Sequence, residues 1–417
     1  MRTLFWLSVL LVLPAALLVI FVFLATSAAP AIPAAAELVV RDLERGREVV
    51  SGLGLKNLRE GEVRVVRLTE DDVEKGVNFA LSRLGGGAAK IDISADALNA
   101  LASLHIPGLN RYLNVRFSLQ PNHGLLVPTR LKLGAVPLPA EPVTRMLIKL
   151  LALSPMAQQV STARDMLRTA TLIKVGGRPI LALQFVWHGQ ALKAAMEATA
   201  GIDGTAIQAY RAALSRQKHA NFANLMTQAF ALAKNRSQAG NAVQENRAAL
   251  TVLAEIALGT SLSQAAGVSG NNLGHAQKKT RRSPVRLAGR EDFAQHFSLS
   301  AFLAATGGTQ LSDLVGVYKE LKDARGGSGF SFNDLAADRA GSRLGEVATR
   351  SDEDARRIQA VLAAGVQQAT FFPRVDDLPE FMQQAEFERR YGGVGAPAYQ
   401  AMADKIEARI NSLKLYR

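Results

Sequence analysis

The residues with the clearest capacity for chemistry lie between positions 290 and 341. A single histidine, His296, is followed by two acidic pairs, Glu320 with Asp323 and Asp334 with Asp338. Acidic residues three or four positions apart share one face of a helix, so each pair can act together. Carboxylates and one imidazole from neighbouring helices suit a divalent-metal site or a general acid–base site. All five residues are therefore candidate catalytic groups, and the candidate metal ligands are the same set without Asp323.

Two other interpretations of these residues stay open. Lys319, Arg325 and Arg339 lie close to the acidic pairs in the sequence, and pairing with them would make a purely structural polar network. The glycine-rich segment 326–331 precedes an expected helix and could instead bind an anion. That segment has neither the P-loop spacing nor the dinucleotide-binding spacing, so no nucleotide site is predicted.

Three short helices must position these groups. Apolar spacing predicts one helix over 293–303, a second over 311–321, and a third that begins at Ser331. Ser331 and Asp334 have the spacing of a capping box, which favours a helix start at that point. Gly341 would let another helix approach this third helix closely.

The same segment resembles a known family. After the histidine come a serine, then G-x-x-KE-x-x-D, then GSGFS-x-x-DL-x-x-D-x-x-G, an order similar to that of the YfiM-like family of predicted periplasmic lipoproteins. The matching residues are His296, Ser300, Gly316, Lys319, Glu320, Asp323, Gly327, Ser328, Gly329, Ser331, Asp334, Asp338 and Gly341. This chain lacks the lipobox cysteine of that family. The resemblance implies a cell-envelope location and no particular reaction.

The amino-terminal sequence predicts a membrane anchor. Leu4 to Leu24 is a run of 21 uncharged residues, and at about 1.5 Å per residue it would match the roughly 30 Å hydrocarbon core. We expect a signal-anchor transmembrane helix in 1–28 and an Ala/Pro linker in 29–36; cleavage after the run is the alternative. Arg2 precedes the run, which predicts a single-pass inner-membrane protein with a cytoplasmic amino terminus and a periplasmic body.

The body is expected to be α+β. In 37–188, alternating apolar residues predict antiparallel strands with a helix packed on them. A strand, a helix with the sequence LTEDDVEKGVNFAL (68–81), amphipathic strands, the segment LGAVPLP (133–139) and a further helix follow in that order. In this pattern, residues 63–151 resemble the YpmS-like extracytoplasmic domains. The chain then becomes mainly α-helical, with a helical segment in 189–265, a basic flexible linker in 266–290, and a helical domain carrying the histidine and acidic residues in 291–417.

Charge and cysteine content limit the partners. The chain has 49 Lys and Arg against 36 Asp and Glu, and 205–290 holds 12 of these basic residues with only two acidic ones. Lys278, Lys279, Arg281 and Arg282 are the candidate contacts for anionic lipid head groups or an acidic envelope polymer, although a solvated surface explains them equally well. No recognition motif points to nucleic acid. The absence of cysteine excludes disulfides and cysteine nucleophiles.

Three functions follow from these patterns, and the sequence leaves open whether the protein is an enzyme. The first is a non-catalytic docking or assembly component of the envelope that binds other envelope proteins or polymer. The second is a metal-assisted hydrolase or transferase that uses His296, Glu320, Asp334 and Asp338 with a divalent metal as cofactor. It requires these side chains to converge within about 5 Å around an accessible pocket. The third is a lipid-binding carrier that uses the apolar face of the sheet.

Overall fold

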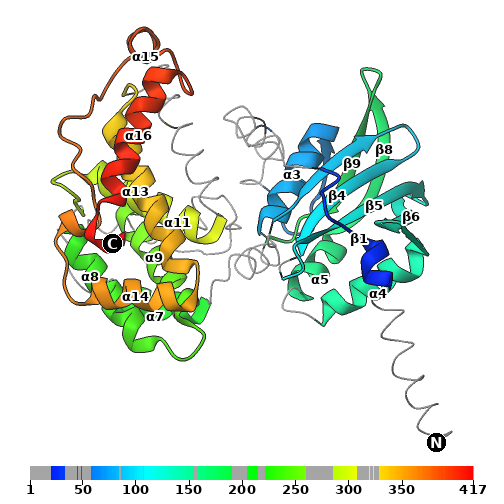
Figure 1. Ribbon diagram of the computed structural model, residues 1–417, viewed down its shortest axis with the longest axis horizontal. Helices are drawn as coiled ribbons and strands as arrows, with labels where there is room; N and C mark the ends of the chain where they lie inside the picture. The colour runs from blue at the N-terminus through cyan, green and yellow to red at the C-terminus, as the bar shows by residue number, and fades with distance from the viewer. Residues whose placement is uncertain are drawn as a thin grey trace, which may run out of the picture. The chain divides into compact units, whose positions relative to one another are not determined.

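The structure is a computed structural model of the 417-residue chain. It describes residues 20–32, 45, 48, 58–83, 86–106, 108–153, 157–189, 204–214, 221–259, 285–307, 319, 323 and 328–416. These fall chiefly into two compact units, divided between His188 and Gly189. We call them the sheet unit and the helical unit, and each is described by itself (Figure 1).

The sheet unit contains two antiparallel sheets. The larger has the strand order β3-β4-β5-β6-β7, with β1 paired to β5, and the smaller has the order β2-β9-β8. The strands are β1 Thr26–Ser27, β2 Val63–Leu68, β3 Ala88–Ile93, β4 Leu98–Ile106, β5 Arg111–Asn122, β6 Leu125–Leu133, β7 Val136–Leu138, β8 Leu167–Val175 and β9 Arg178–Val186. The helices are α3 Glu70–Arg83, α4 Ala140–Ala152 and α5 Ala157–Met166.

Helix α3 is fixed to the sheet by its polar and its apolar residues. It begins at a capping box, in which the Thr69 amide donates to Asp72 and the Asp72 amide donates to the Thr69 hydroxyl. One face then presents Glu70, Glu74 and Asn78, which accept hydrogen bonds from backbone amides of β3. These acceptors satisfy amides of an end strand of the sheet, which would otherwise be open to further pairing. Val73 and Val77 pack on a buried apolar cluster of the sheets, formed by Ile91, Ile93, Leu98 and Leu181.

The helical unit is built around the close crossing of two helices, α11 Glu291–Gly307 and α13 Phe332–Thr349. Around them lie α7 Gly204–Leu214, α8 Phe222–Arg236, α9 Ala242–Leu258, α14 Asp352–Ala363, η2 Gln368–Thr370, α15 Gln384–Tyr391, α16 Pro397–Asn411 and η3 Lys414–Tyr416. A Cβ on Gly341 would overlap the carbonyl oxygen of Phe297, and one on Gly345 would overlap that of Ala301. Only glycine at both positions permits this separation of the two backbones.

The transmembrane part of the expected fold is corrected by the structure. The described chain is α+β, with antiparallel sheets and helices. No helix within the described residues is both long enough and apolar enough to cross a bilayer. The described end of the amino-terminal run, Ile20 to Leu24, is helical and continues through Ala25 straight into β1. Residues 1–19 lie outside the described part. A membrane-spanning helix is therefore not part of the fold that we describe.

The segment after this run also differs from a free linker. Ala31 donates its backbone amide to the Asn114 side chain, and Ile32 donates to the hydroxyl of Ser103. Ala31 and Ile32, in the expected Ala/Pro linker, are thus hydrogen-bonded to β5 and β4 respectively. Residues 33–36 lie outside the described chain.

Candidate functional site

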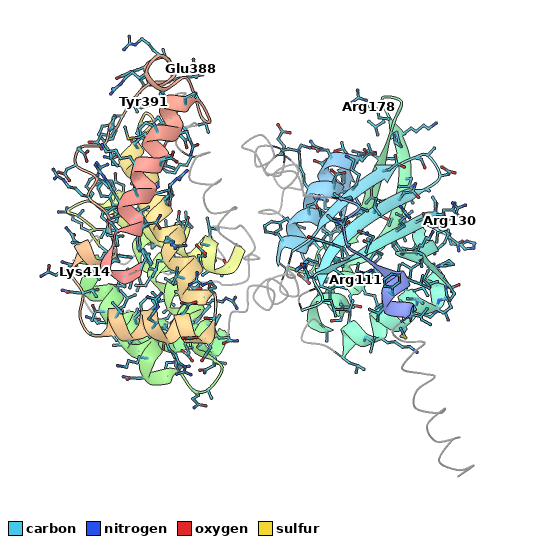
Figure 2. All side chains as sticks on the ribbon, viewed as in Figure 1. Arg111, Arg130, Arg178, Glu388, Tyr391 and Lys414 are labelled. Atoms are coloured by element: carbon cyan, nitrogen blue, oxygen red, sulfur yellow. The ribbon has the colours of Figure 1, made fainter. Side chains whose placement is uncertain are left out.

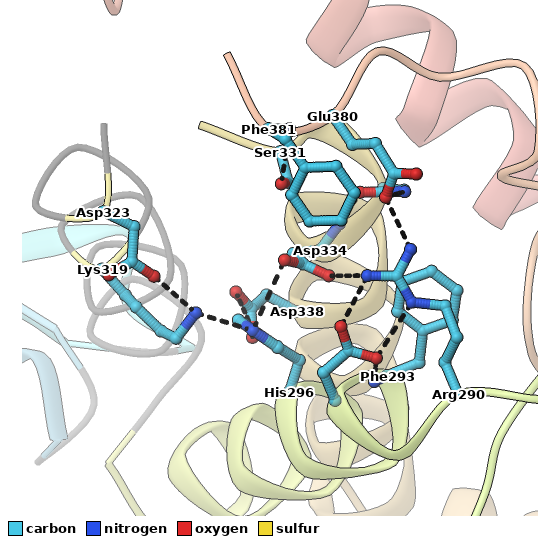
Figure 3. A network of polar contacts seen from close by, with 12 residues as sticks. Arg290, Phe293, His296, Lys319, Asp323, Ser331, Asp334, Asp338, Glu380 and Phe381 are labelled. Atoms are coloured by element: carbon cyan, nitrogen blue, oxygen red, sulfur yellow. Dashed lines mark hydrogen bonds and ion pairs between the residues drawn. The ribbon is translucent and has the colours of Figure 1, made fainter. Parts of the chain in front are cut away.

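The α11–α13 crossing brings His296, Ser300 and Asp338 into one hydrogen-bonded group. His296 and Ser300 lie one turn apart on α11, and both contact Asp338 on α13. Figure 3 shows His296 facing Asp338 and Asp334. The Nδ1 atom of His296 is 3.0 Å from both carboxylate oxygens of Asp338. The Ser300 hydroxyl donates to Asp338 Oδ1 at 2.8 Å. The glycines that allow the close crossing therefore also make this contact geometrically accessible.

Asp334 lies one turn before Asp338 and is the least satisfied member of the group. Its Oδ2 atom is 3.9 Å from His296 Nε2, and its Oδ1 atom is 3.8 Å from a guanidinium nitrogen of Arg290. Oδ1 is buried and makes no hydrogen bond within the described residues. His296 and Asp334 are each only 6% exposed, so both groups are largely withdrawn from water.

Arg290 connects this buried group to the surface. Its guanidinium bonds to both carboxylate oxygens of Asp292, at 3.0 and 2.5 Å, and to Glu380 at 2.5 Å. It also lies over the ring of Phe293, 4.2 Å from the centroid. Glu380 also accepts a hydrogen bond from the side-chain amide of Asn333. Bidentate and stacked contacts of this kind hold an arginine in one orientation.

Lys319 contacts the opposite side of the imidazole. Its Nζ atom is 2.9 Å from His296 Nε2 and 3.1 Å from Asp323. An ammonium cannot donate to an imidazolium, so one of the two groups must be neutral when this contact exists. Lys319 is about half exposed and has Asp323 as another partner, whereas His296 is buried beside two carboxylates. We therefore assign the proton to His296 at neutral pH; in that state the Lys319 ammonium stays paired with Asp323 and no longer donates to Nε2.

Electrostatics support that assignment. Burial on its own would lower the pKa of His296, but the carboxylates of Asp338 and Asp334 outweigh burial and raise the pKa to about 9. Burial raises the pKa of Asp334 above its ordinary value, and the negative charge of Asp292 raises it as well. The nearby His296 opposes both effects but does not outweigh them. A protonated imidazole does not ligate metals, so His296 would have to lose its proton first.

The structure brings together three of the five predicted site residues. His296, Asp334 and Asp338 converge, Asp323 joins them through Lys319, and Glu320 lies outside the described residues. Within the described chain, no group of three or more His, Cys, Asp or Glu side chains is arranged to hold a metal ion. The four cations proposed for anion or polymer binding, Lys278, Lys279, Arg281 and Arg282, also fall outside the described residues.

A pocket of about 590 Å³ opens beside this network. Arg290, Asn333 and Glu380 line it, together with apolar side chains that include Phe293 and Phe372. Its other wall is the chain from Gln368 to Glu380, between α14 and α15. His296, Asp334 and Asp338 do not line it, so the network supports the pocket from behind.

Sequence reasoning missed the residues that reach this pocket. Arg290 was counted only as part of the basic stretch, and Asn333 and Glu380 carried no distinguishing signal. Their positions depend on the loop after α14, which pairs with the residues just before α13 through a bridge between Met382 and Phe330. The one available hint was the apolar and proline content of 371–382.

A second pocket, in the sheet unit, bears on the carrier hypothesis. It has a volume of about 180 Å³ and lies between residues 30–32 and β4, with Ser103 and Tyr112 in its lining. This is smaller than the roughly 300–1,000 Å³ typical of small-molecule sites.

Comparison with known proteins adds no relative: no protein-family model, no curated protein and no solved structure matches this chain. The function must therefore be argued from the geometry of the site.

Proposed function

We propose that this chain is a non-catalytic docking protein whose recognition site is the pocket lined by Arg290, Asn333 and Glu380. The observation that carries the proposal is the way these three side chains are held. Glu380 accepts hydrogen bonds from both Arg290 and Asn333, and Arg290 is also fixed by Asp292 and by the ring of Phe293. Polar groups that are already ordered lose little entropy when a partner binds, which favours binding.

The buried network behind the pocket suits a supporting role. His296 and Asp338 pair with each other at 6% and 3% exposure, and neither lines the pocket. A catalytic acid or base must reach its substrate within hydrogen-bond distance. The pair instead fixes α13, which carries Asn333, against α11, the helix next to Arg290.

The lining of the pocket favours an uncharged ligand. Arg290 pairs with Glu380, and Arg374 pairs with Asp376, so the four lining charges cancel within the pocket. Apolar side chains supply much of the remaining surface, among them Phe372 and Leu378. An apolar side chain next to backbone amide groups would satisfy both kinds of surface. We therefore propose that the pocket takes an uncharged polypeptide segment of a partner protein.

The cell envelope is the compartment we propose for this docking. The support is the resemblance of 296–341 to predicted periplasmic proteins, together with the basic composition of the chain, which suits an anionic surface.

A peptide array tests the proposal. Capped heptapeptides with a central Leu, Phe or Val between Gly, Ser and Asn residues are compared with the same peptides carrying a central Asp or Lys. Ala369→Trp fills the pocket from an exposed position, and Ala364→Trp is the matched control on an exposed alanine outside it. We expect selective binding of the apolar set, a loss of about tenfold or more in the first variant, and no loss in the control. Equal binding by charged peptides, or by the pocket-filling variant, would refute the proposal.

A further inference from the structure

Helix α4 exposes an unusual amount of apolar surface for a helix of a folded domain. The exposed large side chains are Met146, Leu147, Ile148, Leu150, Leu151 and Leu153. Met146 and Leu150 are each 54% exposed, and Leu153 is 86% exposed. A contiguous apolar patch of this kind usually marks a surface that something covers.

The arrangement of these residues around the helix indicates what covers it. At about 100° per residue, the six side chains span an arc of about 220°. A protein groove takes a narrower stripe of residues spaced three and four apart. The remaining arc holds Arg145 and Lys149, with Glu141 paired to Arg145. A broad apolar face with a basic polar face is the pattern of helices that lie in the membrane–water interface.

A second apolar element is attached next to α4. Leu24 accepts a hydrogen bond through its carbonyl from the amide of Ala135, in the turn that leads to β7 and then directly to α4. Arg111, labelled in Figure 2, lies in β5. It donates to the hydroxyl of Thr26 at 2.6 Å and to its carbonyl at 2.9 Å, and β1 pairs with β5. These contacts fix the end of the uncharged run to the sheet.

The side chains of this element are also exposed. Ile20, Phe21, Phe23 and Leu24 are each more than 40% exposed, and the sequence before them carries no charge back to Leu4. The guanidinium of Arg111 lies over the Phe23 ring, 5.0 Å from its centroid. Two exposed apolar elements with cations beside them therefore belong to one end of the sheet unit.

We propose that α4, together with residues 20–24, binds an anionic lipid surface. Its leucine and isoleucine side chains enter the acyl boundary, and Lys149 pairs with head groups while Arg145 stays paired with Glu141. This inference concerns the sheet unit and is independent of the peptide pocket, so either can fail without the other.

A site-specific fluorophore tests the inference. The natural chain contains no cysteine, so Leu150→Cys can be labelled with NBD without other changes to the full chain. Val175→Cys, at a similarly exposed apolar residue at the end of β8, is the control. With vesicles of phosphatidylcholine and phosphatidylglycerol at 3:1, we expect the label at 150 to brighten severalfold and shift to the blue, and the label at 175 to stay unchanged. Vesicles of phosphatidylcholine alone should give a weaker response.

Several results would overturn it. If residues 4–24 alone held the chain on the vesicle, the label at 150 would remain in water. If a second copy or another part of the chain covered α4, the label would be shielded before lipid is added. A further variant, Leu147→Gln with Leu151→Gln, should weaken vesicle binding about tenfold or more. The matched pair Val63→Gln with Val65→Gln should not, and equal losses would also contradict the inference.

Discussion

The charge on His296 makes the stability of the helical unit depend on pH in a predictable direction. Its pKa of about 9 in the fold exceeds the value of about 6.5 expected when it is exposed. Because the pKa is raised in the fold, protonated His296 stabilises the folded state. This stabilisation is complete below pH 6.5 and is lost as the pH rises through 9. The difference corresponds to about 3 kcal/mol, the largest pH-dependent contribution that His296 can make.

His296→Asn isolates this contribution. The asparagine amide keeps a hydrogen-bond donor near the position of Nδ1 and removes the charge. The lost packing costs the same at every pH, so only the difference between two pH values reports the ion pair with Asp338. We expect the variant to lose about 3 kcal/mol more stability, relative to wild type, at pH 6 than at pH 10.

Urea unfolding at both pH values measures this difference. Far-UV circular dichroism follows the helices, and in a Trp6→Phe background the fluorescence of Trp187 follows the sheet unit, because the chain has no other tryptophan. The fluorescence transition should not move. His123→Asn is the control, because His123 is exposed in a turn at φ 48°, a conformation that asparagine tolerates. An equal loss at pH 6 and pH 10 would mean that His296 is neutral, and would refute the proton assignment.

The remaining predictions concern the same crossing and one exposed position of α3. Asp334→Asn should leave stability at pH 7 unchanged or higher, because burial disfavours the charge of Asp334. Asp338→Asn should lower stability by about 3 kcal/mol or more, because it breaks a buried ion pair. Denaturant unfolding compares the two variants, and equal effects on stability would contradict this prediction. Gly341→Ala should cost about 1–3 kcal/mol, because the new methyl group overlaps the Phe297 carbonyl. Gly76→Ala, in α3 with open space around it, should instead raise stability by up to about 1 kcal/mol. Thermal unfolding measures this gain.

Local patterns predicted much of the fold because local physics determines those parts. The apolar alternation in 37–188 predicted antiparallel strands, which β5 and β6 form. The transmembrane expectation was wrong for the described fold. Its basis was the length of the apolar run alone, whereas the end of that run turns at Thr26 into a strand that pairs with β5.

The site was only partly predictable, for a different reason. Asp334 and Asp338 share one face of α13, and Gly341 in the same helix indicates a close helix–helix contact. The convergence of the two aspartates with His296 on α11 could therefore be expected from the sequence. The pocket depends on Glu380, which is 90 residues from its partner Arg290. Local residue spacing does not predict a contact between residues so far apart in the chain, and a single sequence cannot show such a contact.

The most direct test of the docking account is a calorimetric titration of the best apolar heptapeptide into the wild-type chain and its two tryptophan variants. The account predicts saturable one-to-one binding to wild type and to Ala364→Trp, with affinity reduced about tenfold or more in Ala369→Trp. Binding of equal affinity in all three proteins would place the peptide elsewhere and contradict the account.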